Sequence, residues 1–138
     1  MATSRQDIDK MLQSLAQDAS NDIARAIEDV ANEFITSGGY GSSRMHMANN
    51  KRVMEIFRFT ADVMAMQARR CAGGSGGAVR DLVDTHLSYL IDQTIKRRTE
   101  HIETGKTASQ DTEILCANLR QDLKRLKDAT VRGLRAEP

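Results

Sequence analysis

Apolar side chains recur every three or four residues through four long stretches of the chain, which is the spacing of one face of an α-helix. No proline interrupts these stretches, because the only proline is the last residue, Pro138. Proline is the residue that the interior of an α-helix excludes most strongly. Short glycine-bearing segments separate the stretches instead. The sequence therefore predicts helices over residues 4–36, 43–71, 78–103 and 109–132.

The first two predicted helices differ in how much of their surface is apolar. In residues 4–36 the apolar positions form one narrow stripe that continues over roughly four heptads, as in coiled-coil packing. In residues 43–71 they cover well over half of the circumference, and a helix this apolar lies at the centre of its bundle or against another chain. Long helices joined by short loops favour antiparallel neighbours. We therefore expect an all-α, up-down four-helix bundle with coiled-coil-like helices, forming a single domain over residues 1–138.

The wide apolar surface of the second predicted helix supplies a candidate partner interface, formed by Met47, Met54, Phe59 and Met66. Methionine side chains suit a core and an adaptable binding groove alike. The charged residues of this helix form a narrow strip, and Phe59 and Met66 fall beside this strip instead of opposite it. The charged strip consists of Arg44, Lys51, Glu55, Arg58, Asp62 and Arg69. We expect Phe59→Asp to leave helicity intact and to abolish association, whereas unfolding of this variant would place Phe59 in the core.

Charge is distributed unevenly between these two helices, although the whole chain carries a net charge of only +1. Residues 1–37 hold three basic and seven acidic side chains, a net charge of −4. Residues 44–70 hold six basic and two acidic side chains, a net charge of +4. The overall balance excludes a globally basic nucleic-acid binder. The asymmetry favours pairing of the two helices, or leaves a basic face for a polyanion.

The remaining composition predicts a cytoplasmic protein. Residues 1–7 contain no apolar region of a signal peptide. No apolar run approaches the roughly 18 residues that a membrane span requires. Cys71 and Cys116 are isolated and show no metal-type spacing, so we expect them to be small core residues and not a disulfide. No metal site, cofactor, small-molecule substrate or membrane association is predicted.

Two glycine-bearing segments raise the question of phosphate binding. Residues 104–107 resemble the end of a phosphate-binding loop, but Glu100 stands where that motif needs a glycine and a helix precedes the segment, so we expect a turn. Residues 73–77 contain four glycines flanked by Arg69, Arg70 and Arg80. This segment fits a flexible hinge, and it also fits an anion site at the start of the following helix.

Histidine is the other residue type whose chemistry needs weighing. His86 lies in the apolar stripe of the third predicted helix, without a neighbouring basic residue or a Glu-x-x-His pair, so we expect it to be a packing residue. His46 and His101 lie near helix ends and are expected at the surface. No nucleophile elbow or His-Glu-x-x-His motif is present, so no enzyme is predicted. A regulatory or catalytic role of His86 is a third hypothesis, which unchanged behaviour of His86→Leu would dismiss.

These patterns predict a non-catalytic helical-bundle protein that acts in interaction or assembly, as a small subunit or adaptor, by homo-oligomerisation or by binding a partner protein. The alternative is an accessory subunit that binds the nucleic-acid backbone through basic helix faces. In length and predicted architecture the chain resembles the small all-helical subunits of CRISPR effector complexes, and this resemblance rests on no shared motif. In that alternative the phosphate contacts would be Arg69, Arg70, Arg80, Lys96, Arg97, Arg98, Arg120 and Lys124.

Overall fold

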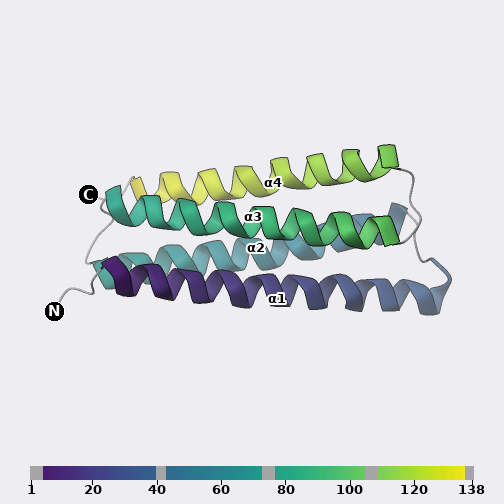
Figure 1. Ribbon diagram of the computed structural model, residues 1–138, viewed down its shortest axis with the longest axis horizontal. Helices are drawn as coiled ribbons and strands as arrows, with labels where there is room; N and C mark the ends of the chain where they lie inside the picture. The colour runs from purple at the N-terminus through teal and green to yellow at the C-terminus, as the bar shows by residue number, and fades with distance from the viewer. Residues whose placement is uncertain (1–4, 40–42, 73–76, 105–108, 136–138) are drawn as a thin grey trace.

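The computed structural model describes residues 5–39, 43–72, 77–104 and 109–135, with most of their side chains. They form four helices and, within the described ranges, no strand. The helices are α1 (Arg5–Ser37), α2 (Ser43–Ala72), α3 (Gly77–Thr104) and α4 (Ser109–Arg135). The four helices pack against one another (Figure 1), which confirms the predicted all-α class. Each helix begins and ends within three residues of its predicted boundary.

Several residues discussed above lie outside the described part of the chain. They include residues 73–76 of the glycine-rich segment and residues 105–107 of the phosphate-loop-like segment. The side chains of Cys71 and His101 also lie outside it. The hinge, anion-site and turn interpretations of these segments therefore stay predictions.

The end of α1 shows how glycine terminates a helix in this chain. Gly38 has a φ of 83°, a left-handed backbone conformation that side-chain-bearing residues seldom adopt. Its N–H donates to the carbonyl oxygen of Ile35 at 3.3 Å, and the N–H of Gly39 donates to that of Phe34 at 2.8 Å. These two bonds form a Schellman motif, which satisfies carbonyl groups that the helix itself leaves unpaired.

The direction of the chain alternates along the long axis of the molecule. In Figure 1 the chain runs to the right along α1 and α3, and to the left along α2 and α4. α1 and α2 therefore form one helical hairpin, and α3 and α4 form another. Each hairpin buries its own apolar stripes against the other hairpin, so the two depend on each other for a core.

The two hairpins pack so that α1 lies beside α3, and α2 lies beside α4. Two hydrogen-bonded pairs, Asp9 with His86 and Ser20 with Arg97, join α1 to α3 with the same sequence separation of 77. A constant separation is that of parallel helices, in agreement with the common direction of α1 and α3 in Figure 1. Loop length determines only which helices form a hairpin, and the contact between hairpins depends on their faces. α2 and α3 meet across the diagonal, whereas no described Cα atoms of α1 and α4 lie within 8 Å.

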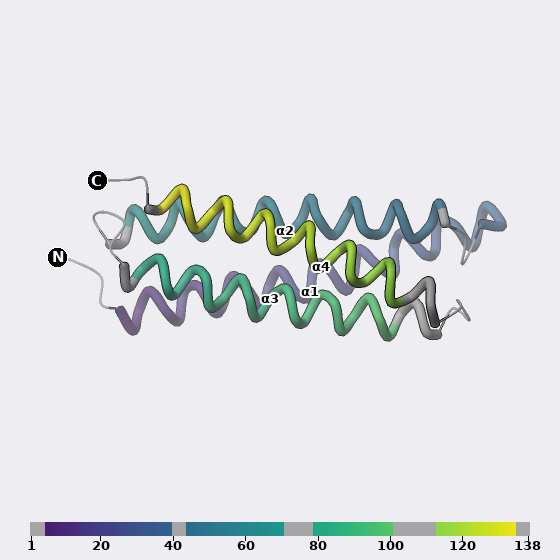
Figure 2. The backbone as a smooth tube through the Cα atoms, turned by 90° about the horizontal axis from the view of Figure 1, so that it is seen from above, coloured from purple at the N-terminus to yellow at the C-terminus, as the bar shows by residue number. Residues whose placement is uncertain are grey.

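α4 crosses the bundle obliquely. Seen from above (Figure 2), the C-terminal end of α4 lies over α2, and its N-terminal part lies toward α3. Side-chain contacts agree with this view. Arg69 of α2 donates to the carbonyl oxygen of Gly133 at 3.3 Å, and Thr99 of α3 lies 3.3 Å from the sulfur of Cys116.

A single hydrophobic core runs between the four helices. α1 contributes a stripe of aliphatic residues, and α2 contributes Phe57 together with small alanines and Met64. The polar residues Asn49, Thr94 and Arg98 also lie inside the bundle, each at most 1% exposed. Cys116 is partly buried against this core, in agreement with its expected role as a small packing residue.

Candidate interaction surface

α2 carries three large apolar side chains that the bundle does not cover. Phe59 is 70% exposed, Met47 is 68% exposed and Met66 is 47% exposed. Met54, the fourth predicted interface residue, is partly buried against the core. α2 therefore presents apolar surface outward as well as inward, which is unusual for a helix packed inside its own bundle.

The four predicted interface residues do not form one patch. Phe59 and Met66 are seven residues apart, and so are Met47 and Met54, so each pair lies on one helix face. Five residues separate Met54 from Phe59, which places the two faces about 140° apart around α2. Phe59 lines a groove between α1 and α2, whereas Met47 and Met54 line a groove between α2 and α4. The spacing of these residues in the sequence already separates the two pairs, whereas the grooves that they line are defined by the packing of α1 and α4.

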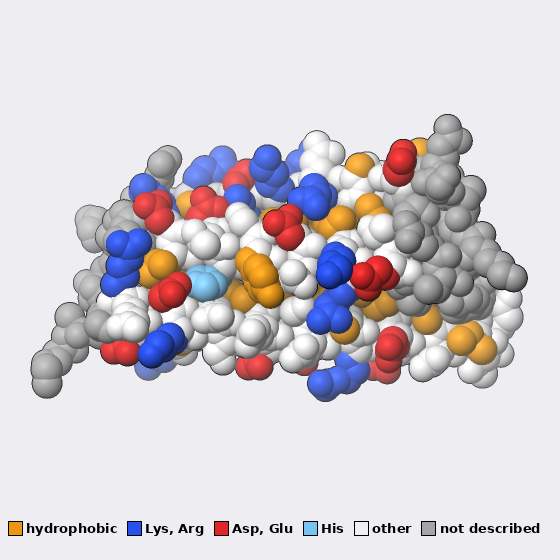
Figure 3. All heavy atoms as spheres, viewed as in Figure 1, with side chains coloured by type: hydrophobic (Ala, Val, Ile, Leu, Met, Phe, Trp, Pro, Cys, Tyr) orange, Lys and Arg blue, Asp and Glu red, His pale blue; other side chains and the backbone are white. Residues whose placement is uncertain are grey.

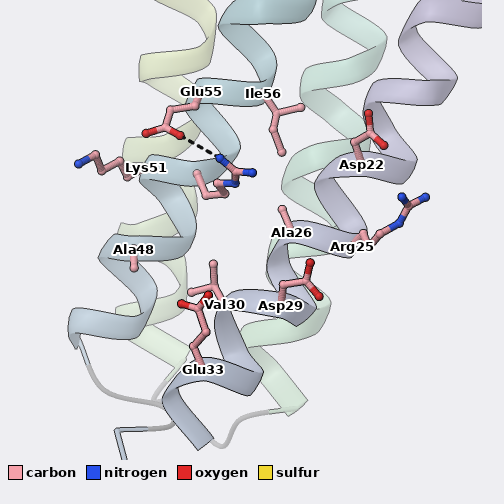
Figure 4. Close-up of a pocket in the computed structure, with 11 residues that line it drawn as sticks. Asp22, Arg25, Ala26, Asp29, Val30, Glu33, Ala48, Lys51, Glu55 and Ile56 are labelled. Atoms are coloured by element: carbon pink, nitrogen blue, oxygen red, sulfur yellow. Dashed lines mark hydrogen bonds and ion pairs between the residues drawn. The ribbon is translucent and has the colours of Figure 1, made fainter. Parts of the chain in front are cut away.

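The α1/α2 groove is a hollow between the first two helices. Beside Phe59 it has a volume of about 330 Å³ and is lined by apolar groups that include Leu15, Ala19, Ile56 and Val63. The next part of the groove, of about 680 Å³, extends toward the loop end of the hairpin. In Figure 4 the side chains of Ile56 and Val30 point into the space between the helices, while Arg25 and Lys51 point away to opposite sides.

The rim of the α1/α2 groove is charged, with an acidic excess on α1 and a small basic excess on α2. α1 contributes Asp22, Asp29 and Glu33 together with Arg25, while α2 contributes Lys51 and Arg52 together with Glu55. Among the described side chains no ion pair joins α1 to α2. Arg52 instead pairs within its own helix with Glu55, at 3.3 Å between Nη1 and Oε2 (Figure 4). Most of the acidic charge of α1 and the basic charge of α2 is therefore left facing outward.

The α2/α4 groove differs from the first in its composition. Its first part is bounded by Met47, Met54, Leu115 and Leu126, with Lys51 and Arg58 on the α2 side. Its second part shares Arg58 and Leu126 and continues along small residues of both helices. The charge of this rim is mixed, since Glu55 and Asp62 also line it.

The predicted anion contacts do not converge on one surface. Arg69 donates to the backbone of α4, and Arg97 donates from its Nε to the hydroxyl oxygen of Ser20 at 3.1 Å. Arg120 pairs with Asp92 at 2.9 Å. In the view of Figure 3, basic side chains gather toward the upper edge, over α4, with acidic ones among them. The other candidates are the exposed Arg70, Lys96 and Lys124 and the half-buried Arg80.

Arg98 is a correction to the predicted anion contacts, because its side chain is fully buried. The inward stripe of α3 continues from Ile91 and Thr94 to position 98, so helical periodicity turns this arginine toward the core. Its Nε donates to Oδ1 of Asn50 at 2.9 Å. Burial away from water lowers the pKa of Arg98 to about 10, and neighbouring Cys116 acts in the opposite direction. The guanidinium is therefore still charged at neutral pH, and it serves the core and not a ligand at the surface.

The histidines also differ from the sequence prediction. His86 is only 13% exposed, and its Nε2 lies 2.6 Å from Oδ1 of Asp9 on α1. This burial agrees with the packing role predicted for His86, whereas its contact with Asp9, 77 residues away, leaves no signal in the sequence. His46 was expected at the surface, yet it is 3% exposed. It lies in the first turn of α2 on the same side as buried Asn49 and Val53, and this spacing was the available signal.

The described residues contain no cluster of three or more His, Cys, Asp or Glu side chains that is placed to hold a metal ion. Within the same residues, none of the helices has the length and apolar character needed to cross a membrane.

Comparison of the chain with protein-family models, with curated proteins and with solved structures found no significant match.

Proposed function

We propose that this chain is a non-catalytic helical-bundle protein that works in interaction or assembly, as a small subunit or adaptor of a larger complex. The observation that carries the proposal is the exposure of Phe59, which is 70% accessible although it lies in the middle of a packed helix. Met66 lies on the same face, and the α1/α2 groove lies beside Phe59. Exposed apolar groups beside a charged rim are typical of surfaces that another protein covers.

The buried positions of α1 support the finer proposal of coiled-coil-like helices. Five of them follow spacings of four, three, four and three, which is the pattern of a heptad seam. These residues are Leu12, Ala16, Ala19, Ile23 and Ala26. Such a rigid rod suits a subunit that presents one face to a partner.

The alternative of nucleic-acid-backbone binding has less support. Of its eight proposed contacts, Arg98 is buried, and Arg69, Arg97 and Arg120 already bond to protein groups. Phosphate binding requires several free cations on one face, because its strength grows with the number of phosphates neutralised. The remaining exposed candidates, Arg70, Lys96 and Lys124, lie on three different helices.

Size-exclusion chromatography with light scattering and the 260/280 nm absorbance ratio tests the proposal. We expect the wild type to elute as two or more chains with the ratio of a pure protein. A triple aspartate variant of the exposed apolar residues of α2 should elute as one folded chain, while a triple aspartate variant of exposed apolar residues elsewhere keeps the wild-type mass. The α2 variant changes Met47, Phe59 and Met66, and the matched control changes Ile35, Tyr89 and Ile114.

Two results would oppose the proposal. A monomeric wild type with a normal absorbance ratio would contradict self-assembly and leave only a different protein as partner. A high absorbance ratio that falls to normal in high salt would favour the nucleic-acid alternative, since phosphate contacts weaken steeply as salt rises.

A further inference from the structure

We infer that the partner covering the α1/α2 groove is a second copy of this chain, and that Phe59 of each copy enters the groove of the other. This inference rests on the proposed function and adds the occupant, the surface and the symmetry. Among the described residues, the most exposed large apolar side chain, Phe59, lies on the same face as a hollow with several apolar lining residues. A surface that carries both a projection and a matching hollow can pair with itself around a two-fold axis.

The hollow beside Phe59 has the size and lining to accept a phenyl ring. Its volume is about 330 Å³, and it is open to the surface. The apolar side chains of Leu15, Ala19, Ile56 and Val63 line it, together with polar residues at its rim: Asp18, Asp22, Arg52, Glu55 and Thr60. A phenyl ring placed there would lose its exposure to water and contact aliphatic groups of both helices. Phe59 cannot fill the hollow of its own chain while it is 70% exposed.

Charge selects both the occupant and its orientation. α1 carries a net charge of −4 and α2 carries +4, and the two helices lie side by side on this face. A two-fold axis parallel to the helices places each α2 opposite the partner's α1, so that opposite charges meet. A two-fold axis across the helices would place α1 opposite α1, and like charges would repel. A second copy in the first orientation is therefore electrostatically complementary without any change in the chain.

The area of this face agrees with the size of a stable dimer interface. A helix of 30 residues is about 45 Å long, and two adjacent helices are about 20 Å wide. The face therefore offers about 900 Å² on each copy, compared with about 800 Å² for each partner of a standard interface. The α2/α4 groove lacks this self-complementarity, because the residues that line it from α4 are uncharged and offer no opposite charge to the charged side chains of α2.

The first test compares single substitutions in the two grooves by sedimentation equilibrium of the full chain. Phe59→Asp should raise the dimer dissociation constant at least about tenfold, because the ring would no longer be buried. Met47→Asp, equally exposed but in the other groove, should change it less than about threefold. Circular dichroism should show unchanged helicity for both variants, which separates loss of association from loss of folding.

The second test reverses the charges across the inferred interface. Arg52 and Asp22 both line the α1/α2 groove, and they belong to the helices that would face each other. Arg52→Glu and Asp22→Arg should each weaken the dimer about tenfold. The double variant restores opposite charges, so its dissociation constant should return to within about threefold of the wild type. Absence of this rescue would overturn the inferred orientation.

The outcomes separate this inference from the proposed function. If Met47→Asp dissociates the assembly and Phe59→Asp does not, the inference falls while self-assembly stands. A wild-type mass of three or more chains would also overturn the closed two-fold pairing without affecting assembly as such. A wild type that stays monomeric at the highest attainable concentration would overturn both the inference and self-assembly.

Discussion

Substitution of Asn49 tests how much a buried polar group costs in this core, because the Asn49 amide is buried and makes no hydrogen bond to the described residues. Its side chain is 0% exposed, and neither Oδ1 nor Nδ2 has a partner within the described residues. A buried amide that makes no hydrogen bond costs about 1–3 kcal/mol in mutational measurements. Leucine has the same branched shape as asparagine, so it can occupy the site with little overpacking.

We therefore expect Asn49→Leu to raise the free energy of unfolding by about 2–4 kcal/mol. This range combines the removed amide cost with part of the roughly 1.5–3 kcal/mol that burial of a leucine contributes. In a chain of 138 residues the Tm should rise by about 6 °C or more. Urea unfolding followed by circular dichroism measures the change. All variants need the same protein concentration, because association would make the apparent stability depend on it.

The adjacent Asn50 provides a matched control with the opposite expected sign. Its Oδ1 accepts a hydrogen bond from Nε of Arg98 at 2.9 Å. Asn50→Leu removes the acceptor from a buried charged donor, which should lower the free energy of unfolding by about 1.5–3 kcal/mol. A loss of stability in Asn49→Leu, or the same sign in both variants, would refute the reasoning, since it would mean that the Asn49 amide is hydrogen-bonded in solution.

Three further substitutions test other parts of the packing, each by urea unfolding. Gly133→Ala should raise the free energy of unfolding by about 0.5–1 kcal/mol, because alanine favours the helix interior more than glycine does. The new Cβ fits, since it would meet Nη2 of Arg69 at an ordinary contact distance of 3.6 Å; a loss of stability would mean that the helices pack more closely here. Phe57→Ala should lower it by about 3–5 kcal/mol, since Phe57 is fully buried, and a cost below about 1 kcal/mol would exclude it from the core. Asp9→Asn should cost less than about 1 kcal/mol despite its 2.6 Å contact with His86, because Asp9 is 48% exposed to screening solvent; a larger loss would show that this pair organises the α1/α3 contact.

Local patterns were sufficient to predict the helices, because helix formation depends on periodicity and on residues close in sequence. The stripe of α1 and the Gly38–Gly39 terminus are examples, since both are written within a few turns of chain. Helix neighbours were harder to predict. The parallel contact of α1 with α3 depends on residues such as Ser20 and Arg97, which are 77 positions apart. The periodicity within one helix gives no information about contacts between residues so far apart in the sequence.

The candidate site was predictable in its residues but not in its geometry. Phe59 and Met66 stood beside the charged strip of α2 in the sequence, and the structure places both side chains at the surface. Helical spacing separates them from Met47 and Met54, but the grooves beside each pair depend on where α1 and α4 pack. The prediction of Arg98 as a surface anion contact was wrong. It rested on the run of three basic residues that Arg98 ends, and not on helical periodicity. The stripe through Leu87, Ile91 and Thr94 would have turned it inward.

The wide apolar surface of α2 has two causes, and only one of them concerns a partner. α2 contacts α1 and α4 as neighbours and α3 across the diagonal, so three helices cover it inside one chain. Residues such as Phe57 and Met64 are fully buried by these contacts and carry no information about association. Phe59 and Met66 stay exposed, because none of the described helices of the same chain covers the outer side of the α1/α2 groove. Association with a second copy therefore depends on these two exposed side chains and not on the total apolar content of α2. For this reason, a substitution of Phe59 tests the inferred dimer better than a substitution in the core.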